Sequence, residues 1–266
     1  MGWLRPVRAM LRHVAGRERV TVWRWLRAPR LRWALFRDPV DCIIYGLLLS
    51  RDRIRFVQIG SNDGRTGDPL WSFRRYASWR GLLVEPVAPV FRRLRENYAP
   101  WADRFTFENV AIAAEPGHRP FYRFDDPSSS PPGADQLGSL DRTLLQRLAR
   151  RHGRSETGIV ATTVECVTLP QLLAKHGIRE LDLLHIDAEG LDYEILCQIE
   201  RAQCRPSVVL YEHVHLSDAV RHDASTMLLA SGYHVNTIEG DTLAVSAHAL
   251  ATMPPLDRAW RLVTAS

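Results

Sequence analysis

The chain has 266 residues, of which 45% are hydrophobic and 24% are charged, and its formal net charge is +5. These proportions are those of an ordinary soluble globular protein, and the length suffices for one sizeable core. No apolar run approaches the length of a membrane span. The four cysteines form no CxxC pair, which argues against a zinc ribbon or a disulfide framework. We therefore expect reduced thiols and a cytoplasmic location.

Residues 1–37 form a basic N-terminal extension with Glu18 as its one acidic residue, in which arginines alternate with Trp3, Trp23, Trp25 and Trp33. This mixture suits an anionic membrane surface or a nucleic-acid backbone. Of the two we expect peripheral contact with the inner face of a membrane and no nucleic acid. The alternative is a helical extension that packs its tryptophans on the main domain and leaves its arginines in solvent. Residues 38–266 are expected to form the main domain.

A helix over residues 38–53 opens the main domain, and an apolar strand then ends in the stretch Phe56–Gly64. Asp68 and Pro69 have the form of an N-cap and a first helical residue, which predicts a helix to about residue 77. In a strand–loop–helix unit of this kind, backbone N–H groups face a bound cofactor. The next strand, Gly81–Glu85, ends in an acid placed to accept hydrogen bonds from ribose hydroxyls. The pattern therefore predicts an adenosine-containing cofactor.

In the middle of the chain, the sequence predicts helices over residues 86–98, 142–152 and 169–176, of which the second is basic. It predicts a strand over residues 105–112, a loop over residues 125–138 and a short extended segment over residues 162–167. Asn109 and Ala111, at the end of the third strand, are expected near the adenine of the cofactor. The loop is rich in Pro, Ser and Gly, and it is either a lid over the site or a disordered segment.

The stretch Leu181–Gly190 is a buried strand that delivers Asp187 and Glu189 at its carboxyl end, and the strand 207–213 delivers Glu212 and His213. Helices are expected over residues 193–199 and 218–231, and a closing hairpin over 233–238 and 242–245. Strands that alternate with helices predict a doubly wound, mostly parallel sheet with one antiparallel hairpin strand. Ligands bind beyond the carboxyl ends of such strands, where all these polar residues are expected to meet.

With these residues in hand, the chain resembles the FkbM family of S-adenosylmethionine-dependent methyltransferases. The resemblance lies in Phe56–Gly64, Gly81–Pro86, Glu108–Ala113 and Leu181–Leu196. It implies a class I methyltransferase fold of Rossmann-like type, S-adenosylmethionine as cofactor, and O-methylation of a hydroxyl on a sugar, glycan or natural product. The cofactor-binding residues are then expected to be Gln58, Gly60, Ser61, Asn62, Asp63, Gly64, Glu85, Asn109 and Ala111.

The sequence departs from the family at four positions. The family often has Asp where Gln58 stands, Ala where Ser61 stands, Lys where His185 stands and Glu where Asp192 stands. The first two departures leave cofactor binding intact as an expectation. The change at His185 leaves open the substrate class and the proton acceptor.

The expected catalytic residues are Asp187, Glu189 and His213. A hydroxyl acceptor must lose its proton, and His213 is the base best suited by its intrinsic pKa. Asp187 orients the acceptor, serves as the base itself, or holds a metal. A metal-free site is expected; if magnesium binds, its ligands are expected to be Asp187, Glu189 and Glu212.

Two other interpretations stay open. A nicotinamide-dependent oxidoreductase uses a similar sheet, but the loop Gly60–Gly64 lacks the glycine spacing for close approach to a pyrophosphate. A non-catalytic binding module would use the basic extension to hold a membrane or a nucleic acid, and its domain would be a scaffold only.

Overall fold

The computed structural model describes residues 38–124, 138–151, 153 and 155–265, and these form two compact units. The smaller unit holds helices α4 (Pro39–Ser50) and α11 (Pro254–Thr264). A Cβ at Gly46 would lie 2.9 Å from the Cβ of Ala259, so a glycine is needed for the two helices to approach this closely. Asp38 caps α4 by accepting a hydrogen bond from the backbone N–H of Val40, which confirms the helix predicted there.

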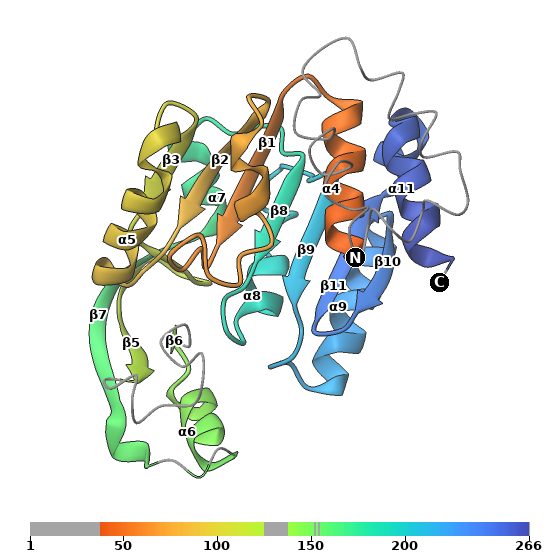
Figure 1. Ribbon diagram of the computed structural model, residues 1–266. Coiled ribbons are helices and arrows are strands. Elements are labelled where there is room, and N and C mark those ends of the chain that lie inside the picture. Colours follow the sequence, from red (N-terminus) through yellow and green to blue (C-terminus); the bar gives the residue numbers. More distant parts are fainter. Residues whose placement is uncertain (1–37, 125–137, 152, 154, 266) are drawn as a thin grey trace, which may run out of the picture. The chain divides into compact units, whose positions relative to one another are not determined.

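The larger unit, residues 53–252, contains a seven-stranded sheet in the order β10-β11-β9-β8-β1-β2-β3 (Figure 1). Its strands, in chain order, are β1 (Ile54–Ile59), β2 (Trp79–Val84), β3 (Phe105–Glu108), β8 (Leu183–Ile186), β9 (Val208–Glu212), β10 (Tyr233–Ile238) and β11 (Asp241–Ser246). All neighbours pair in parallel except β11, which runs antiparallel to both β9 and β10. The predicted class I methyltransferase fold, with its antiparallel hairpin strand, is confirmed.

Helices pack on both faces of this sheet. Leucines of α7 (Leu169–Lys175) join one core with Val57 of β1, Ile186 of β8 and apolar residues of α8 (Asp192–Leu196) and α9 (Asp218–Ala230). On the other face, the ring of Tyr98 in α5 (Ala88–Tyr98) meets that of Phe105 in β3 edge to face at 4.9 Å. On the strands, the ring of Phe56 stacks on that of Trp79 at 4.8 Å.

The helix predicted from Asp68 to residue 77 is wrong. The segment forms only the 3₁₀-helix η1 (Trp71–Arg75), and Leu70 rather than Asp68 precedes it. The carboxylate of Asp68 instead accepts hydrogen bonds from the N–H of Leu70 and the amide of Gln58, and its burial raises its pKa to about 6. The aromatic residues of this segment have low helix propensity, since their side chains lose rotamer freedom against the preceding turn.

A second sheet of four strands, in the order β4-β7-β5-β6, was not predicted. Its members are β4 (Ala111–Ile112), β5 (Gly117–Phe124), β6 (Gly138–Ser139) and β7 (Ile159–Val167). The predicted strand 105–112 is therefore divided between two sheets. It breaks where the side-chain amide of Asn109 donates hydrogen bonds to the carbonyls of Glu85 and Pro86. The extended segment predicted over 162–167 is the end of the nine-residue strand β7.

The remaining elements are α6 (Arg142–Arg151), α10 (Ala247–Thr252) and the 3₁₀-helices η2 (Ala99–Trp101) and η3 (Glu156–Gly158). Helix α6 confirms the predicted basic helix. The Arg/Trp-rich extension, residues 1–37, and residues 125–137 of the predicted loop lie outside the described residues. The domain boundary at residue 38 therefore stays a prediction. Among the described residues, none of the helices is both long and apolar enough to cross a membrane.

Candidate functional site

The loop after β1 is fixed against the ends of the neighbouring strands. Gly60 has φ +77, and a Cβ at this position would lie 1.7 Å from the carbonyl oxygen of Asp187, so only glycine fits. The N–H groups of Gly60 and Ser61 both donate to the carbonyl of Val84, at 3.0 and 2.9 Å. The hydroxyl of Ser61 donates to the carbonyl of Gln58 and accepts from the N–H of Val84. These contacts hold the loop where the ends of β1, β2 and β8 meet.

The second half of the loop is a tight turn closed by its own side chains. Asn62 and Gly64 have positive φ, at +47 and +65. The carboxylate of Asp63 accepts hydrogen bonds from the N–H groups of Arg65 and Thr66. Burial opposes ionisation of Asp63, but the bonds from Thr66 and Arg65 outweigh it and lower its pKa. Asp63 therefore shapes the turn.

Glu85 follows β2 directly, and its carboxylate faces the loop. One oxygen accepts a hydrogen bond from the N–H of Asn62 at 3.0 Å and the other from the N–H of Val87 at 2.8 Å. Burial nevertheless raises the pKa of Glu85 to about 7. A carboxylate oxygen has two lone pairs, so each oxygen can still accept a bond from a ligand hydroxyl. The amide of Asn109 holds the carbonyls of Glu85 and Pro86 in place from behind.

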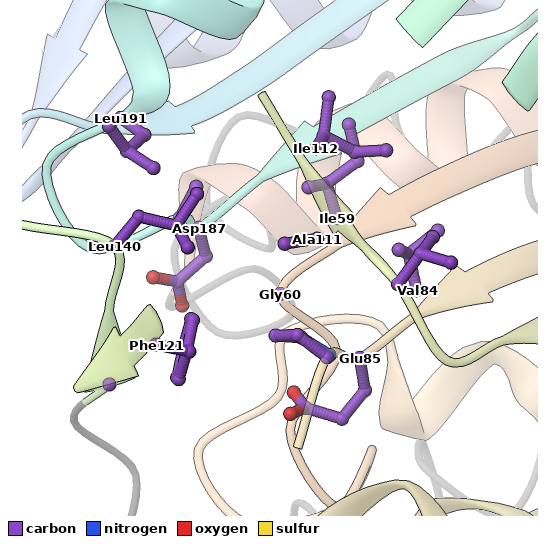
Figure 2. A pocket seen from close by; sticks show the side chains of 14 residues that line it. Ile59, Gly60, Val84, Glu85, Ala111, Ile112, Phe121, Leu140, Asp187 and Leu191 are labelled. Carbon is purple, nitrogen blue, oxygen red and sulfur yellow. The ribbon is translucent and has the colours of Figure 1, made fainter. Parts of the chain in front are cut away.

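A pocket opens between the Gly60 loop, Glu85 and the second sheet, with about 470 Å³ of space that no protein atom fills. That space includes open solvent, and the enclosed part of the pocket is about 60 Å³. Figure 2 shows the carboxylates of Glu85 and Asp187 reaching into this pocket from the ends of β2 and β8. Its walls are mainly apolar and include Pro86, Val110, Ala111, Ile112, Phe121, Leu140 and Leu191. An apolar pocket with two carboxylates suits a flat ring that carries hydroxyl groups.

The environment of Asp187 in the pocket disfavours the ionised form of its carboxyl group. Its N–H donates to the carbonyl of Ile59 at 3.0 Å, but its carboxylate accepts no hydrogen bond from the described residues. Burial raises the pKa of Asp187 well above its usual value, and the nearby charges of Glu189 and Asp192 add to the effect. Such a carboxyl group readily takes up a proton or a cation.

The loop after Asp187 is shaped by Asp192. Its carboxylate accepts hydrogen bonds from the N–H groups of Ala188 and Gly190, at 3.2 and 3.1 Å. Burial raises the pKa of Asp192 to about 7 in spite of these bonds. Glu189, at the tip of this loop, has φ +50, and its carbonyl accepts a bond from the hydroxyl of Ser139 at 2.8 Å.

Glu189 and Glu212 converge on a histidine. Nε2 of His215 lies 3.0 Å from Oε2 of Glu189 and 3.6 Å from Oε2 of Glu212. Burial raises the pKa of Glu212 to about 9, and the charges of Asp187 and Glu189 contribute. We call Glu189, Glu212 and His215 the His–Glu cluster.

His213, expected as the proton acceptor, has a different place. Its Nδ1 lies 2.9 Å from the hydroxyl of Thr242 in the hairpin, and burial followed by the charge of Arg221 lowers its pKa. The structure therefore does not bring His213 into the His–Glu cluster. The histidine found there is His215, two residues further along the chain.

The predicted cofactor-binding residues divide into two sets. Those that line the pocket are Gly60, Glu85 and Ala111, and Asp187 joins them. Those that support the loop or the strand ends from outside the pocket are Gln58, Ser61, Asn62, Asp63, Gly64 and Asn109. Lining residues that the sequence did not indicate are Phe121 and Gly138 of the second sheet, and Leu140, which follows β6. These apolar residues carry no signal without knowledge of that sheet.

Comparison with known proteins gives one family match. A family model described as a methyltransferase FkbM domain matches residues 58–235. A search of the curated proteins found no match.

Solved structures of methyltransferases are similar at low identity. FkbM from Methylobacillus flagellatus is 12% identical, with 90% of this chain and 57% of that chain covered and a TM-score of 0.47. A methyltransferase from Geobacter sulfurreducens is 11% identical over 91% of this chain and 95% of that chain, with a TM-score of 0.43. The O-methyltransferase from Bacillus cereus, solved as a complex with SAH, is 12% identical over 88% of this chain and 93% of that chain, with a TM-score of 0.42.

Proposed function

The chain belongs to the FkbM family of methyltransferases, and we propose that it transfers a methyl group from S-adenosylmethionine to a hydroxyl of a sugar, glycan or natural product. The observation that carries this proposal is the pocket that joins Gly60, Glu85 and Asp187. It offers a carboxylate beyond the second parallel strand, where this type of sheet binds a ribose, and a second carboxylate beside the glycine loop.

The residues present fit the cofactor. In this proposal Glu85 accepts hydrogen bonds from the ribose hydroxyls with the lone pairs that Asn62 and Val87 leave free. The apolar walls at Pro86, Ile112 and Leu191 take the adenine ring. S-adenosylmethionine supplies an electrophilic methyl group on a positively charged sulfur atom.

Methyl transfer from a sulfonium is an in-line displacement, so the main work of the chain is positioning. With the cofactor bound, the hydroxyl oxygen of the acceptor would form the bond to the methyl carbon as the carbon–sulfur bond breaks, with the electrons of that bond left on sulfur. The proton of the hydroxyl passes to Asp187 in this proposal. Burial raises the pKa of Asp187, which makes its carboxylate a stronger base than an exposed one. His213 is a poorer candidate, because it faces Thr242.

Calorimetry with the full chain tests the proposal. Saturable binding of S-adenosylmethionine and of its demethylated product is expected, with no comparable binding of NAD. Binding of NAD alone would favour the oxidoreductase interpretation. Folded protein that binds neither cofactor would refute the proposal.

We further propose that the chain works in the cytoplasm at the inner face of a membrane, which its Arg/Trp-rich residues 1–37 contact. Sedimentation of the full chain with lipid vesicles tests this. Binding to anionic vesicles that weakens with salt is expected; equal binding to neutral vesicles, or none, would contradict the proposal. The metal-free site, with Asp187, Glu189 and Glu212 as ligands if magnesium binds, stays a prediction.

A further inference from the structure

We propose that Glu189, Glu212 and His215 form a binding site for a divalent transition-metal ion. The three side chains each offer one ligand atom, and these atoms lie within 4.8 Å of one another. Metal binding at these residues is separate from methyl transfer and can be measured without a methyl acceptor. Only the role of the metal in the reaction rests on the proposed function.

The distances within the His–Glu cluster are those of ligands around one ion. Metal–nitrogen and metal–oxygen bonds of about 2.0–2.2 Å place neighbouring ligands roughly 3.0 Å apart at a right angle and about 3.4 Å apart at a tetrahedral angle. Nε2 of His215 lies 3.0 Å from Oε2 of Glu189 and 3.6 Å from Oε2 of Glu212. Both distances are close to those of neighbouring ligands around one ion, and the two carboxylates offer ligand atoms within 4.8 Å of each other.

Two carboxylate oxygens of the His–Glu cluster lack hydrogen-bond partners among the described residues. Oε2 of Glu189 and Oε2 of Glu212 are both buried, and neither has a hydrogen-bond partner in the part of the chain that the structure describes. The imidazole of His215 is close enough to Glu189 for an ion pair, but it is not oriented for a hydrogen bond. Two buried carboxylate oxygens without partners are costly, and a bound cation would satisfy both at once.

The cluster adjoins the pocket. Ser139, which donates its hydroxyl to the carbonyl of Glu189, is the neighbour in sequence of the lining residue Leu140. Glu189 itself follows the lining residues Asp187 and Ala188. An ion held by three protein ligands keeps open positions. One of these positions would take the acceptor hydroxyl, orient it toward the methyl group and make its proton easier to remove.

The ligand set selects the metal. One imidazole and two carboxylates suit Mn²⁺, Fe²⁺ or Zn²⁺ better than Mg²⁺, which prefers oxygen ligands and retains its water. The sequence predicted a metal-free site, with Asp187, Glu189 and Glu212 as the ligands if magnesium binds; in the present proposal a metal does bind, and His215 stands in place of Asp187.

Metal binding to the full chain, stripped of metal with a chelator, tests the proposal. Titration with Mn²⁺ followed by electron paramagnetic resonance is expected to show one saturable site per chain, and calorimetry with Zn²⁺ the same stoichiometry. His215→Gln and Glu212→Gln should each weaken Mn²⁺ binding at least tenfold.

A matched control comes from another histidine–carboxylate pair. Nε2 of His176 lies 2.6 Å from the carboxylate of Glu108, and His176→Gln should leave Mn²⁺ binding unchanged. Folding of each variant is checked by circular dichroism, and Glu212→Gln serves if His215→Gln does not fold.

Absence of saturable Mn²⁺ and Zn²⁺ binding would overturn the proposal, as would variants that bind as tightly as the wild type. Loss of stability in His215→Gln without any metal binding by the wild type would mean that His215 is an ion-pair partner only, which also overturns it. Calorimetry with S-adenosylmethionine on the same protein separates the two proposals. Cofactor binding without metal binding refutes the metal site alone, and metal binding without cofactor binding refutes the proposed function alone.

Discussion

Gly60→Ala should destabilise the protein far more than an ordinary glycine substitution. Gly60 follows β1 directly and has φ +77, and a Cβ there would lie 1.7 Å from the backbone carbonyl oxygen of Asp187 at the end of β8. That contact must open to about 3.0 Å, and no side-chain rotation can relieve it because the obstacle is main chain. The change forces the end of β8 away from the loop.

The size of the effect follows from two contributions. A left-handed conformation costs a non-glycine residue about 1–2 kcal/mol, of which about 0.4–1 kcal/mol is regained from the lower entropy of the unfolded chain. Separation of the strand ends also breaks the hydrogen bonds from Asp187 to Ile59 and from Gly60 to Val84, at about 1 kcal/mol each. We therefore expect Gly60→Ala to lower the free energy of unfolding by about 3 kcal/mol.

Gly177→Ala is the matched control, since Gly177 has φ +60 and a Cβ there meets no atom within 4 Å. Gly177→Ala should lower the free energy of unfolding by about 1 kcal/mol, from backbone strain alone. Urea unfolding of both variants measures the two values, and calorimetry with S-adenosylmethionine should show lost binding for Gly60→Ala only. If Gly60→Ala is no less stable than Gly177→Ala, the described contact between the loop and β8 is wrong.

Three further predictions concern the pocket and its support. Glu85→Gln should weaken binding of S-adenosylmethionine by about 10- to 150-fold in calorimetry, because a charged acceptor of about 1.5–3 kcal/mol is lost; unchanged affinity would exclude Glu85 from the ribose site. The raised folded-state pKa of Asp187 means that the folded protein retains this proton to higher pH than the unfolded chain, so stability falls as pH rises above the unfolded value of 3.8. Asp187→Asn should therefore melt higher than the wild type at pH 8, bind S-adenosylmethionine and lose turnover about 10²–10⁴-fold; a lower melting temperature with full turnover would show a merely structural acid. Ser139→Ala should cost about 1–3 kcal/mol in urea unfolding, because the carbonyl of Glu189 and the N–H of Asp141 lose their partner; an unchanged midpoint would mean that Ser139 does not hold the Glu189 loop.

The main sheet was predictable because its strands are apolar runs that stop at polar residues. Ile54–Ile59 and Leu183–Ile186 are buried almost throughout, and each is followed by a loop residue that the fold needs, Gly60 and Asp187. Parallel strands place such ends together, so the meeting of Gly60, Glu85 and Asp187 followed from the order of elements alone.

The second sheet was not predictable by the same means. Strand β5 has only two buried side chains, Phe121 and Phe124, among exposed or half-buried polar ones, so its apolar pattern is too weak to identify a strand. The break of the strand 105–112 depends on hydrogen bonds from Asn109 to residues more than 20 positions away. The pocket walls at Phe121 and Leu140 were missed for this reason.

The choice between two histidines was beyond the sequence as well. His213 and His215 both follow β9, and an alternating strand pattern would place them on the same side. The chain leaves the strand after Glu212, however, and His213 bonds to Thr242 while His215 turns toward Glu189. Only the path of this loop separates the two roles.

The central claim is methyl transfer from S-adenosylmethionine to a hydroxyl, and incubation of the protein with methyl-labelled S-adenosylmethionine and a cell lysate tests it most directly. Mass spectrometry of the labelled product is expected to find a new methyl ether. The label should be strongly reduced with Asp187→Asn, which still binds the cofactor. Label on nitrogen or carbon would contradict O-methylation, and protein that binds S-adenosylmethionine but labels no acceptor in any lysate fraction would contradict the claim of methyl transfer.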